Sequence, residues 1–265
     1  MKNKTPKIRT RFLGHASLLP IAAGMIQTGG ATIIYQQNFD SLIAGSSLVG
    51  QAGFTGGNHD VVDQGGGDYA AAGRISAGGQ WAGVTAPLGS TVSTGWVWTS
   101  FTLESNSSDT RRGSAVALVN GPDVSDGGNW AQNHVSFAGL AQWQLRAVPA
   151  NASNTGVTTN APDSIIGAVN VDTGTAYMWV NPDGTDQFDP ADGGTADATL
   201  IDSKFEGPFD HLFLTGRNAA TSSPTYDDII VATTSADVGL VTVPEPSTLL
   251  LGGLGLLALL RRRRG

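Results

Sequence analysis

The sequence contains no cysteine, which excludes disulfide bonds and thiolate-ligated metal sites. Glutamate is also scarce: residues 32–243 contain only Glu104 and Glu206, whereas aspartate is abundant. Asp, Gly, Asn, Ser and Thr favour turns and are poor helix formers, while Glu is a good one. No window of ten or more residues in this region carries a helical apolar stripe. Short strands joined by many turns are therefore expected.

Basic residues are scarce outside the two ends of the chain. Nine of the fifteen lysines and arginines lie before residue 12 or after residue 260. Residues 32–243 keep six of them against twenty-one acidic residues, a formal charge of −15. Nucleic acid and anionic membrane surfaces repel a domain with this charge. We therefore expect no nucleic-acid partner.

A long apolar run occurs at the C-terminus. A polar box, the apolar run and a basic stop follow one another there: Pro244, Glu245 and Pro246; Leu249 to Leu260; and Arg261, Arg262, Arg263 and Arg264. As a helix, the run would measure about 18 Å, which is shorter than the roughly 30 Å hydrocarbon core of a bilayer. The arginines would stay on the cytoplasmic side, because moving guanidinium groups through lipid is costly. We expect a short transmembrane helix with everything before Val243 outside.

This order of residues resembles the PEP-CTERM sorting signal of exported bacterial proteins. The resemblance rests on Pro244, Glu245 and Pro246, and the tail departs from the pattern only in being slightly short. It implies that an exosortase, a membrane-embedded cysteine protease-like transpeptidase, recognises the box and removes the helix. The alternative for residues 244–265 is an ordinary C-terminal membrane helix. A buried core helix is disfavoured, because four consecutive arginines would have to leave the interior.

The first 31 residues have the pattern of a secretory signal peptide. Five basic residues and no acidic one occur in the first eleven, and an apolar stretch from Ala16 to Ile26 follows. The run ends in small residues, so signal peptidase is expected to cut between Ala31 and Thr32 after the export machinery has engaged the segment. The alternative is a basic arm that binds lipid or nucleic acid.

Residues 32–243 are expected to form one all-β domain, because no linker or fixed-period repeat interrupts them. Several short segments in this region are rich in β-branched and aromatic residues and are bounded by turn formers. These predicted strands are Thr94 to Leu103, Ser114 to Val119, Ala176 to Val180, Asp210 to Leu214 and Asp228 to Thr233. Strands at this spacing favour two antiparallel sheets packed face to face.

Three pieces of this region resemble concanavalin A-like (LamG-like) jelly-roll domains. They are Tyr35 to Gly53 at the opening, Tyr177 to Asp183 in the middle and Tyr226 to Val238 at the close. The resemblance implies a two-sheet antiparallel jelly-roll sandwich. Phe39 is expected to point inward, and the strand with Ile229, Ile230 and Val231 is expected to be covered on both faces.

Glycoside hydrolases and lyases occur on this fold, so catalytic acids need to be considered. A retaining hydrolase needs two carboxyl groups about 5 to 5.5 Å apart, which the jelly-roll glucanases place as Glu-x-Asp-x-Glu on one strand. Glu104 has no acid two residues away, and Glu206 lies in a turn. No serine lies in a Gly-x-Ser-x-Gly elbow, and the histidines are scattered. We expect no catalytic residues and no zinc site.

Calcium is the metal that the composition favours, although no cofactor is firmly expected. Hard oxygen ligands on flexible loops suit calcium, and a loop near the middle of the chain is crowded with aspartates. The candidate ligands are Asp183, Asp186, Asp189 and Asp192. Their spacing does not match an EF-hand, and the alternative is a solvated loop.

Six tryptophans offer a second kind of binding surface, because sugar faces stack on exposed indoles. Trp96, Trp98 and Trp179 are expected in the core, since the first two share one strand face and the third is flanked by apolar residues. Trp81 and Trp130 lie in glycine-rich contexts and are the candidates for ligand stacking.

These observations predict an exported, exosortase-sorted protein of the cell surface or extracellular matrix with a non-catalytic domain. Association with extracellular polysaccharide is what the resemblance implies. The alternatives are a carbohydrate-active enzyme with an unfamiliar acid pair and a calcium-stabilised adhesin.

Overall fold

A computed structural model describes residues 33–57, 59–66, 68–73, 82–104, 114–122, 134–147, 151–159, 162–216 and 224–242. The chain divides into two units, Met1–Gly30 and Ala31–Gly265, and the described residues all belong to the second. Among these residues no helix is both long and apolar enough to cross a bilayer. The predicted C-terminal helix and the predicted signal segment lie outside them.

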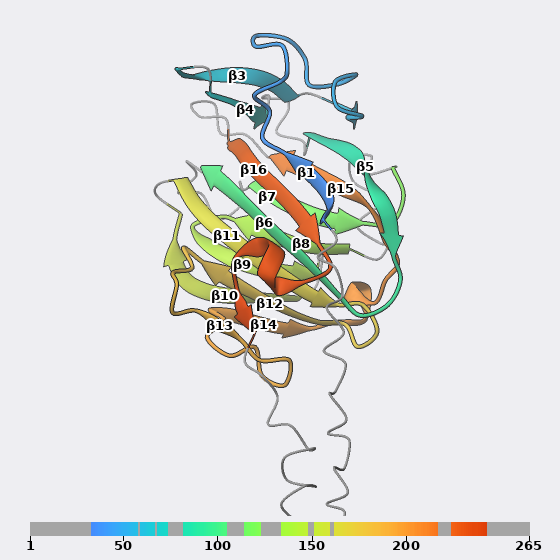
Figure 1. The fold of residues 1–265 in the computed structure, drawn as a ribbon, viewed down its shortest axis with the longest axis vertical. Coiled ribbons are helices and arrows are strands. Elements are labelled where there is room, and N and C mark those ends of the chain that lie inside the picture. The colour runs from blue at the N-terminus through green and yellow to red at the C-terminus, as the bar shows by residue number, and fades with distance from the viewer. Residues whose placement is uncertain are drawn as a thin grey trace, which may run out of the picture. The chain divides into compact units, whose positions relative to one another are not determined.

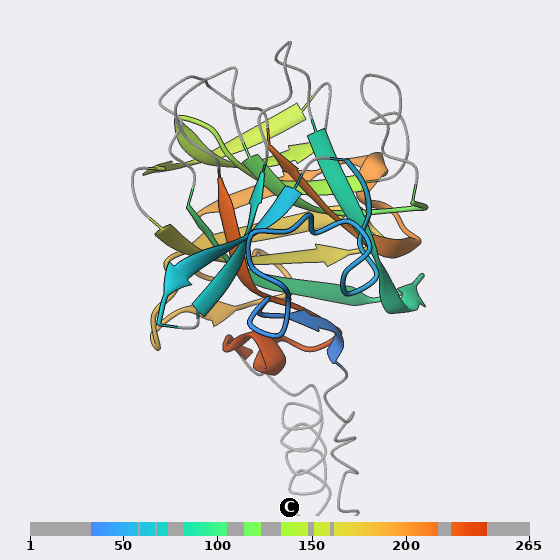
Figure 2. The ribbon, with the colours of Figure 1, turned by 90° about the horizontal axis from the view of Figure 1, so that it is seen from above.

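The described strands form two antiparallel sheets stacked as layers (Figure 1, Figure 2). The eight-stranded sheet has the order β14 (Ala198–Ile201), β12 (Thr175–Val180), β11 (Pro162–Asn170), β6 (Trp96–Glu104), β16 (Thr225–Ala232), β4 (Asp68–Gly73) and β3 (His59–Gly65), with β1 (Ile33–Gln37) also paired to β16. The seven-stranded sheet has the order β10 (Asn151–Thr158), β9 (Gln142–Ala147), β8 (His134–Gly139), β7 (Ser114–Val119), β15 (Phe209–Gly216), β5 (Ala82–Val92) and β2 (Thr55–Gly56).

Four shorter elements complete the described fold. β13 (Gln187–Phe188) and β17 (Val241–Thr242) form a small parallel pair. η2 (Ser203–Phe205) and η3 (Ser235–Val238) are single turns of 3-10 helix. The all-β, two-sheet antiparallel sandwich expected from the sequence is confirmed, and β6, β7, β12, β15 and β16 lie where strands were predicted.

The main core lies between the two sheets and follows from the alternation of side chains along each strand. On β9, Trp143, Leu145 and Ala147 face this core, and the residues between them face outward. Phe39 is fully buried in the core, as predicted, even though its φ of 62° is unusual for a side chain of its size.

A second apolar cluster covers the outer face of the eight-stranded sheet. Trp98 and Trp179 are almost fully buried there, as predicted, and Trp96 is partly buried beside them. Phe188 of β13 packs edge-on against Trp98, with ring centroids 4.5 Å apart and planes at 89°. Ile230 packs against the same cluster, so β16 is covered on both faces, as expected.

Candidate ligand-binding site

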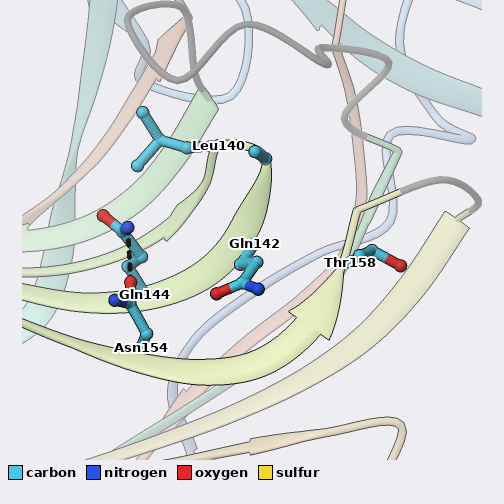
Figure 3. Close-up of a pocket in the computed structure, with 6 residues that line it drawn as sticks. Leu140, Gln142, Gln144, Asn154 and Thr158 are labelled. Carbon is cyan, nitrogen blue, oxygen red and sulfur yellow. Dashed lines mark hydrogen bonds between the residues drawn. The ribbon is translucent and has the colours of Figure 1, made fainter.

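The outer face of the seven-stranded sheet carries a pocket at its β9–β10 edge (Figure 3). The pocket has a volume of about 430 Å³. Its lining residues come from the β8–β9 turn and the two strands: Leu140, Ala141, Gln142, Gln144, Asn154 and Thr158. A strand pair at a sheet edge therefore presents a concave surface to solvent, with amide groups set among apolar atoms.

Alternation along β9 directs the glutamines into this pocket. Because Trp143 and Leu145 are buried in the main core, Gln142 and Gln144 must point to the opposite side. Asn154 of β10 is paired with Gln144, and Thr158 is paired with Gln142. The pocket is thus lined by two neighbouring rows of the outer face.

A bulge in β10 shapes the pocket. The register shifts between Asn154 and Thr158, and Gly156 in this segment has a φ of 81°, a conformation that glycine adopts without strain. The hydroxyl of Thr155 donates to the carbonyl of Trp143 at 3.1 Å and accepts from the amide of Val157 at 3.1 Å. These bonds replace part of the regular ladder, so the bulge is a fixed feature of the edge.

Buried hydrogen bonds hold the floor of the site in place. The indole Nε1 of Trp143 donates to Oδ2 of Asp163 at 2.6 Å, and the amide of Asn181 donates to Oδ1 at 2.7 Å. Asp163 is only 6% exposed. Both carboxylate oxygens are satisfied by groups from different strands or loops, which fixes β9 against the eight-stranded sheet.

The chemistry of the pocket is that of primary amides. Nε2 of Gln144 donates to Oδ1 of Asn154 at 2.5 Å (Figure 3), which leaves the acceptor of Gln144 and the donor of Asn154 facing outward. Gln142 adds a third side-chain amide, which is half-buried. None of the described residues that line the pocket carries a carboxyl group. Primary amides of this kind both donate and accept hydrogen bonds.

The described residues that line this pocket were not singled out from the sequence. Trp81 and Trp130, the cleavage position at Ala31 and Thr32, the Pro-Glu-Pro box and the arginine stop all lie outside the described residues. Stacking of a ligand on the two tryptophans stays a prediction.

The aspartates proposed as calcium ligands cap turns of their own loop. Asp183 accepts from the amide and the hydroxyl of Thr185 at 2.7 and 2.6 Å, and these bonds lower the pKa of its carboxyl group. Asp189 and Asp192 each accept from a backbone amide two residues later. Within the described ranges no group of three or more His, Asp or Glu side chains is arranged to hold a metal ion. Calcium binding by this loop stays a prediction.

Sequence reasoning missed Gln142, Gln144 and Asn154. The signal available for the first two was the alternation in the segment Gln-Trp-Gln-Leu-Arg, which places polar side chains on one face of a strand. No comparable signal marks Asn154, because its place opposite Gln144 depends on strand pairing.

Comparison with known proteins adds a family model for one end of the chain. Residues 242–264 match the PEP-CTERM protein-sorting motif. No curated protein matches the chain by sequence. The sorting signal expected from the C-terminal residues is therefore confirmed.

Solved structures share the architecture of the sandwich at low sequence identity. A sialidase is 7% identical with a TM-score of 0.50, and the match covers 78% of this chain and 19% of the sialidase. The globular domain of T. cruzi calreticulin is 11% identical with a TM-score of 0.47, covering 78% and 90% of the two chains.

A lectin from Bauhinia forficata, solved in complex with GalNAc, is 10% identical with a TM-score of 0.45, covering 76% and 99%. Structural similarity at sequence identities this low shows a shared fold and nothing more. The chain thus carries a PEP-CTERM protein-sorting motif at its C-terminus, after an all-β two-sheet antiparallel sandwich.

Proposed function

We propose that the protein is exported, sorted through its C-terminal motif, and displayed at the cell surface or in the extracellular matrix. The match of residues 242–264 to the PEP-CTERM motif carries this proposal. An exosortase would recognise Pro244, Glu245 and Pro246 and remove the apolar helix, which serves until then as an inner-membrane anchor. The signal segment of residues 1–31 would bring the chain to the export machinery and to signal peptidase.

Replacing Glu245 by Ala tests the sorting step. The mass of the intact protein recovered from the producing cells would show loss of the C-terminal helix in the wild type and its retention in the variant. Glu206→Ala is the matched control, because it removes a glutamate outside the motif. Identical processing of Glu245→Ala and wild type would refute the assigned role of the box.

The sandwich itself is proposed to be non-catalytic and to bind polysaccharide. What supports this is the pocket at the β9–β10 edge, with amide groups from Gln142, Gln144 and Asn154 on a fixed floor. Amides donate to and accept from sugar hydroxyls, and a cleft at a sheet edge is open enough for a polymer to pass along it.

A glycan-array screen of the full-length protein tests the binding half. We expect the double variant Gln144→Ala with Asn154→Ala to lose about tenfold in affinity for the glycans that wild type retains, since one or two hydrogen bonds are removed. Gln187→Ala on β13 is the control, because it removes an exposed amide outside the pocket. Equal binding by the double variant and wild type would exclude the pocket as the ligand site.

A carbohydrate-active enzyme on the same fold is the alternative. It would need two carboxyl groups within about 6 Å of each other in a groove, and the described lining of the pocket supplies none. Release of new reducing ends from any polysaccharide on the array by purified protein would favour the enzyme.

A further inference from the structure

The sorting motif begins inside the folded sandwich. The family match starts at Thr242, which is also the second residue of β17 and is paired with Phe188 of β13. Val243 alone separates this paired strand from Pro244, the first residue of the sorting box. Pro244 and Pro246 have no backbone N–H to donate, so neither can lengthen the pairing. A strand of the sandwich therefore runs directly into the segment that an exosortase would bind.

The connection between β17 and the box is short on the scale of an enzyme. A fully extended chain spans at most about 3.5 Å per residue, so Pro244 lies within about 7 Å of Thr242. A helix with its side chains is about 10 Å across, and packed sheets lie about 10 Å apart. No wall of an enzyme's cleft fits between the sandwich and the box over that distance. An enzyme that encloses the box on all sides therefore needs β17 to be unpaired.

The pairing of β17 is weak enough to open. Among the described strands β17 pairs only with β13, in a parallel register that joins Gln187 to Val241 and Phe188 to Thr242. Parallel pairing is slightly less stable per residue than antiparallel pairing. Two residues share few main-chain hydrogen bonds, and each such bond makes a modest net contribution to stability. Release of β17 is therefore a small event compared with unfolding of the sandwich.

β13 is fixed to the sandwich, so β17 is the strand that moves. Phe188 is only 3% exposed, and its ring lies 4.9 Å from that of Trp96 and 4.5 Å from that of Trp98, measured between centroids. The amide of Gln187 donates to the hydroxyl of Thr195 at 3.0 Å, and the carbonyl of Gln187 accepts from the amide of Thr195 at 3.1 Å. These contacts hold β13 whether or not β17 is present.

Leu240 limits how far the chain can peel. Leu240 and Val238 are 2% and 8% exposed and belong to the second apolar cluster. The amide of Leu240 also donates to the carbonyl of Ser235 at 3.0 Å. Peeling can proceed back to Leu240 without opening the cluster, and the free chain from there to Pro244 spans up to about 14 Å. That length admits an element about 10 Å thick, whereas about 7 Å does not.

We infer that β17 is a strap on β13 and that its release limits the rate at which an exosortase processes the sorting box. The inference rests on the proposed sorting function and adds a step to it. The rate of helix removal is then proportional to the fraction of molecules in which β17 is free. Phe188 is a positioning residue for this reaction, because it seats the strand on which the strap lies.

Insertion of Gly-Ser-Gly-Ser between Val243 and Pro244 tests the strap. The four residues add up to about 14 Å, so the box becomes accessible while β17 stays paired. Pulse-labelled producing cells, sampled over time for the intact mass of the protein, should show loss of the C-terminal helix at least about threefold faster than in wild type. The same insert between Gly184 and Thr185, in the exposed loop before β13, should leave the rate unchanged.

A disulfide bond between β13 and β17 should have the converse effect. The sequence has no cysteine, so Gln187→Cys with Val241→Cys introduces one pair of thiols, at positions that face each other in the register. The oxidised double variant should be processed at least about tenfold more slowly than wild type, and reductant should restore the rate. Thr175→Cys with Ile201→Cys on the β12–β14 pair is the matched control and should leave the rate unchanged.

Combining the disulfide with the insert separates access to the box from general stiffening of the sandwich. In the combined variant the oxidised bond should no longer slow processing, because the box is reached without release of β17. An oxidised bond that slows processing equally with and without the insert would overturn the strap. The insert decides alone if the disulfide bond does not form.

The remaining outcomes distinguish the strap from the sorting function. An unchanged rate with the insert before Pro244 would overturn the strap, and sorting would still stand if Glu245→Ala retains the C-terminal helix while wild type loses it. Failure of wild type to lose its C-terminal helix would overturn both.

Discussion

At the scale of single residues, His59 stands out because a polar ring lies in the main core without hydrogen bonds. It is 1% exposed, and both ring nitrogens lack a partner in the described structure. The ring of Tyr226 packs 5.8 Å from it, measured between centroids. Burial lowers the pKa of His59 from 6.5 to about 4, and the nearby Asp60 carboxylate only partly opposes this. The protein therefore carries an acid-sensitive site in its core.

His59→Phe is expected to remove this acid sensitivity. The unfolded histidine takes up a proton below pH 6.5, whereas the folded one does so only below about 4. Stability therefore falls as the pH drops through this window, by about 2 kcal/mol between pH 7 and pH 5. Urea denaturation at pH 7 and pH 5 should show this histidine-dependent loss of unfolding free energy in wild type and not in the variant. An equal loss in both proteins would contradict the assignment.

The contribution of Asp227 to folding stability has the opposite dependence on pH. Burial raises the pKa of its carboxyl group to about 7, and repulsion from Asp228, Asp68 and Asp40 adds to the shift. The unfolded carboxyl group loses its proton near pH 4 and the folded one near 7, so stability contributed by the protonated form is lost as the pH rises through that window.

Asp227→Asn should therefore stabilise the protein at pH 8 more than at pH 5. The change keeps the Oδ1 that accepts from the amide of Asp228 at 2.8 Å. Urea midpoints at the two pH values provide the measurement, and Asp68→Asn serves as a control that relieves only part of the repulsion. A gain of the same size at both pH values would show that ionisation is not its source.

At the scale of elements, the aspartate-rich loop between β12 and β14 acts as a cover for the second apolar cluster. β13 lies within this loop and carries Phe188 onto Trp96 and Trp98, with centroids 4.9 and 4.5 Å apart. The same short strand pairs with β17, the last described strand before the sorting box. Phe188 thus links the loop, the cluster and the end of the sandwich.

Phe188→Ala is expected to destabilise the protein by about 3 to 5 kcal/mol, as is usual when a buried phenylalanine is truncated. Chemical denaturation followed by tryptophan fluorescence should show an earlier midpoint. The native emission should shift to the red as water reaches Trp98. Phe188→Leu should cost clearly less, because most of the volume is kept. A midpoint unchanged in the alanine variant would show that the loop contributes no packing energy.

At the scale of the whole molecule, the charge of residues 32–243 should make stability depend on ionic strength. The twenty-one acidic residues are opposed by only six basic ones, so the excess negative charges repel one another. Salt at about 150 mM screens such repulsion beyond roughly 8 Å. We expect the melting temperature to rise as NaCl increases from about 10 to 150 mM. CaCl₂ and MgCl₂ compared at one ionic strength separate general screening from a specific site, because screening alone raises the melting temperature equally with both salts. A calcium-specific rise reversed by a chelator would favour the adhesin.

Much of the fold could be predicted from local patterns. Ser114 to Val119 was predicted as a strand with the observed bounds, because it is a short run rich in β-branched and apolar residues bounded by turn formers, and all six of its residues are buried. β5 was missed, since Pro87 and two glycines interrupt its pattern. β10 was missed because its small polar residues are typical of a turn. Its ladder forms because β9 offers a buried, hydrogen-bonded neighbour.

The sequence by itself determined the sorting motif, because that signal is a run of consecutive residues whose chemistry is read in order. It also determined the all-β class, through local alternation and turn formers. Only the tertiary structure decided that Gln144 would face Asn154 and that Arg146 would lie beside Ser136. The physical reason is that strand order and register are set by burying the two inner faces together, and no local stretch of sequence encodes which edges then meet.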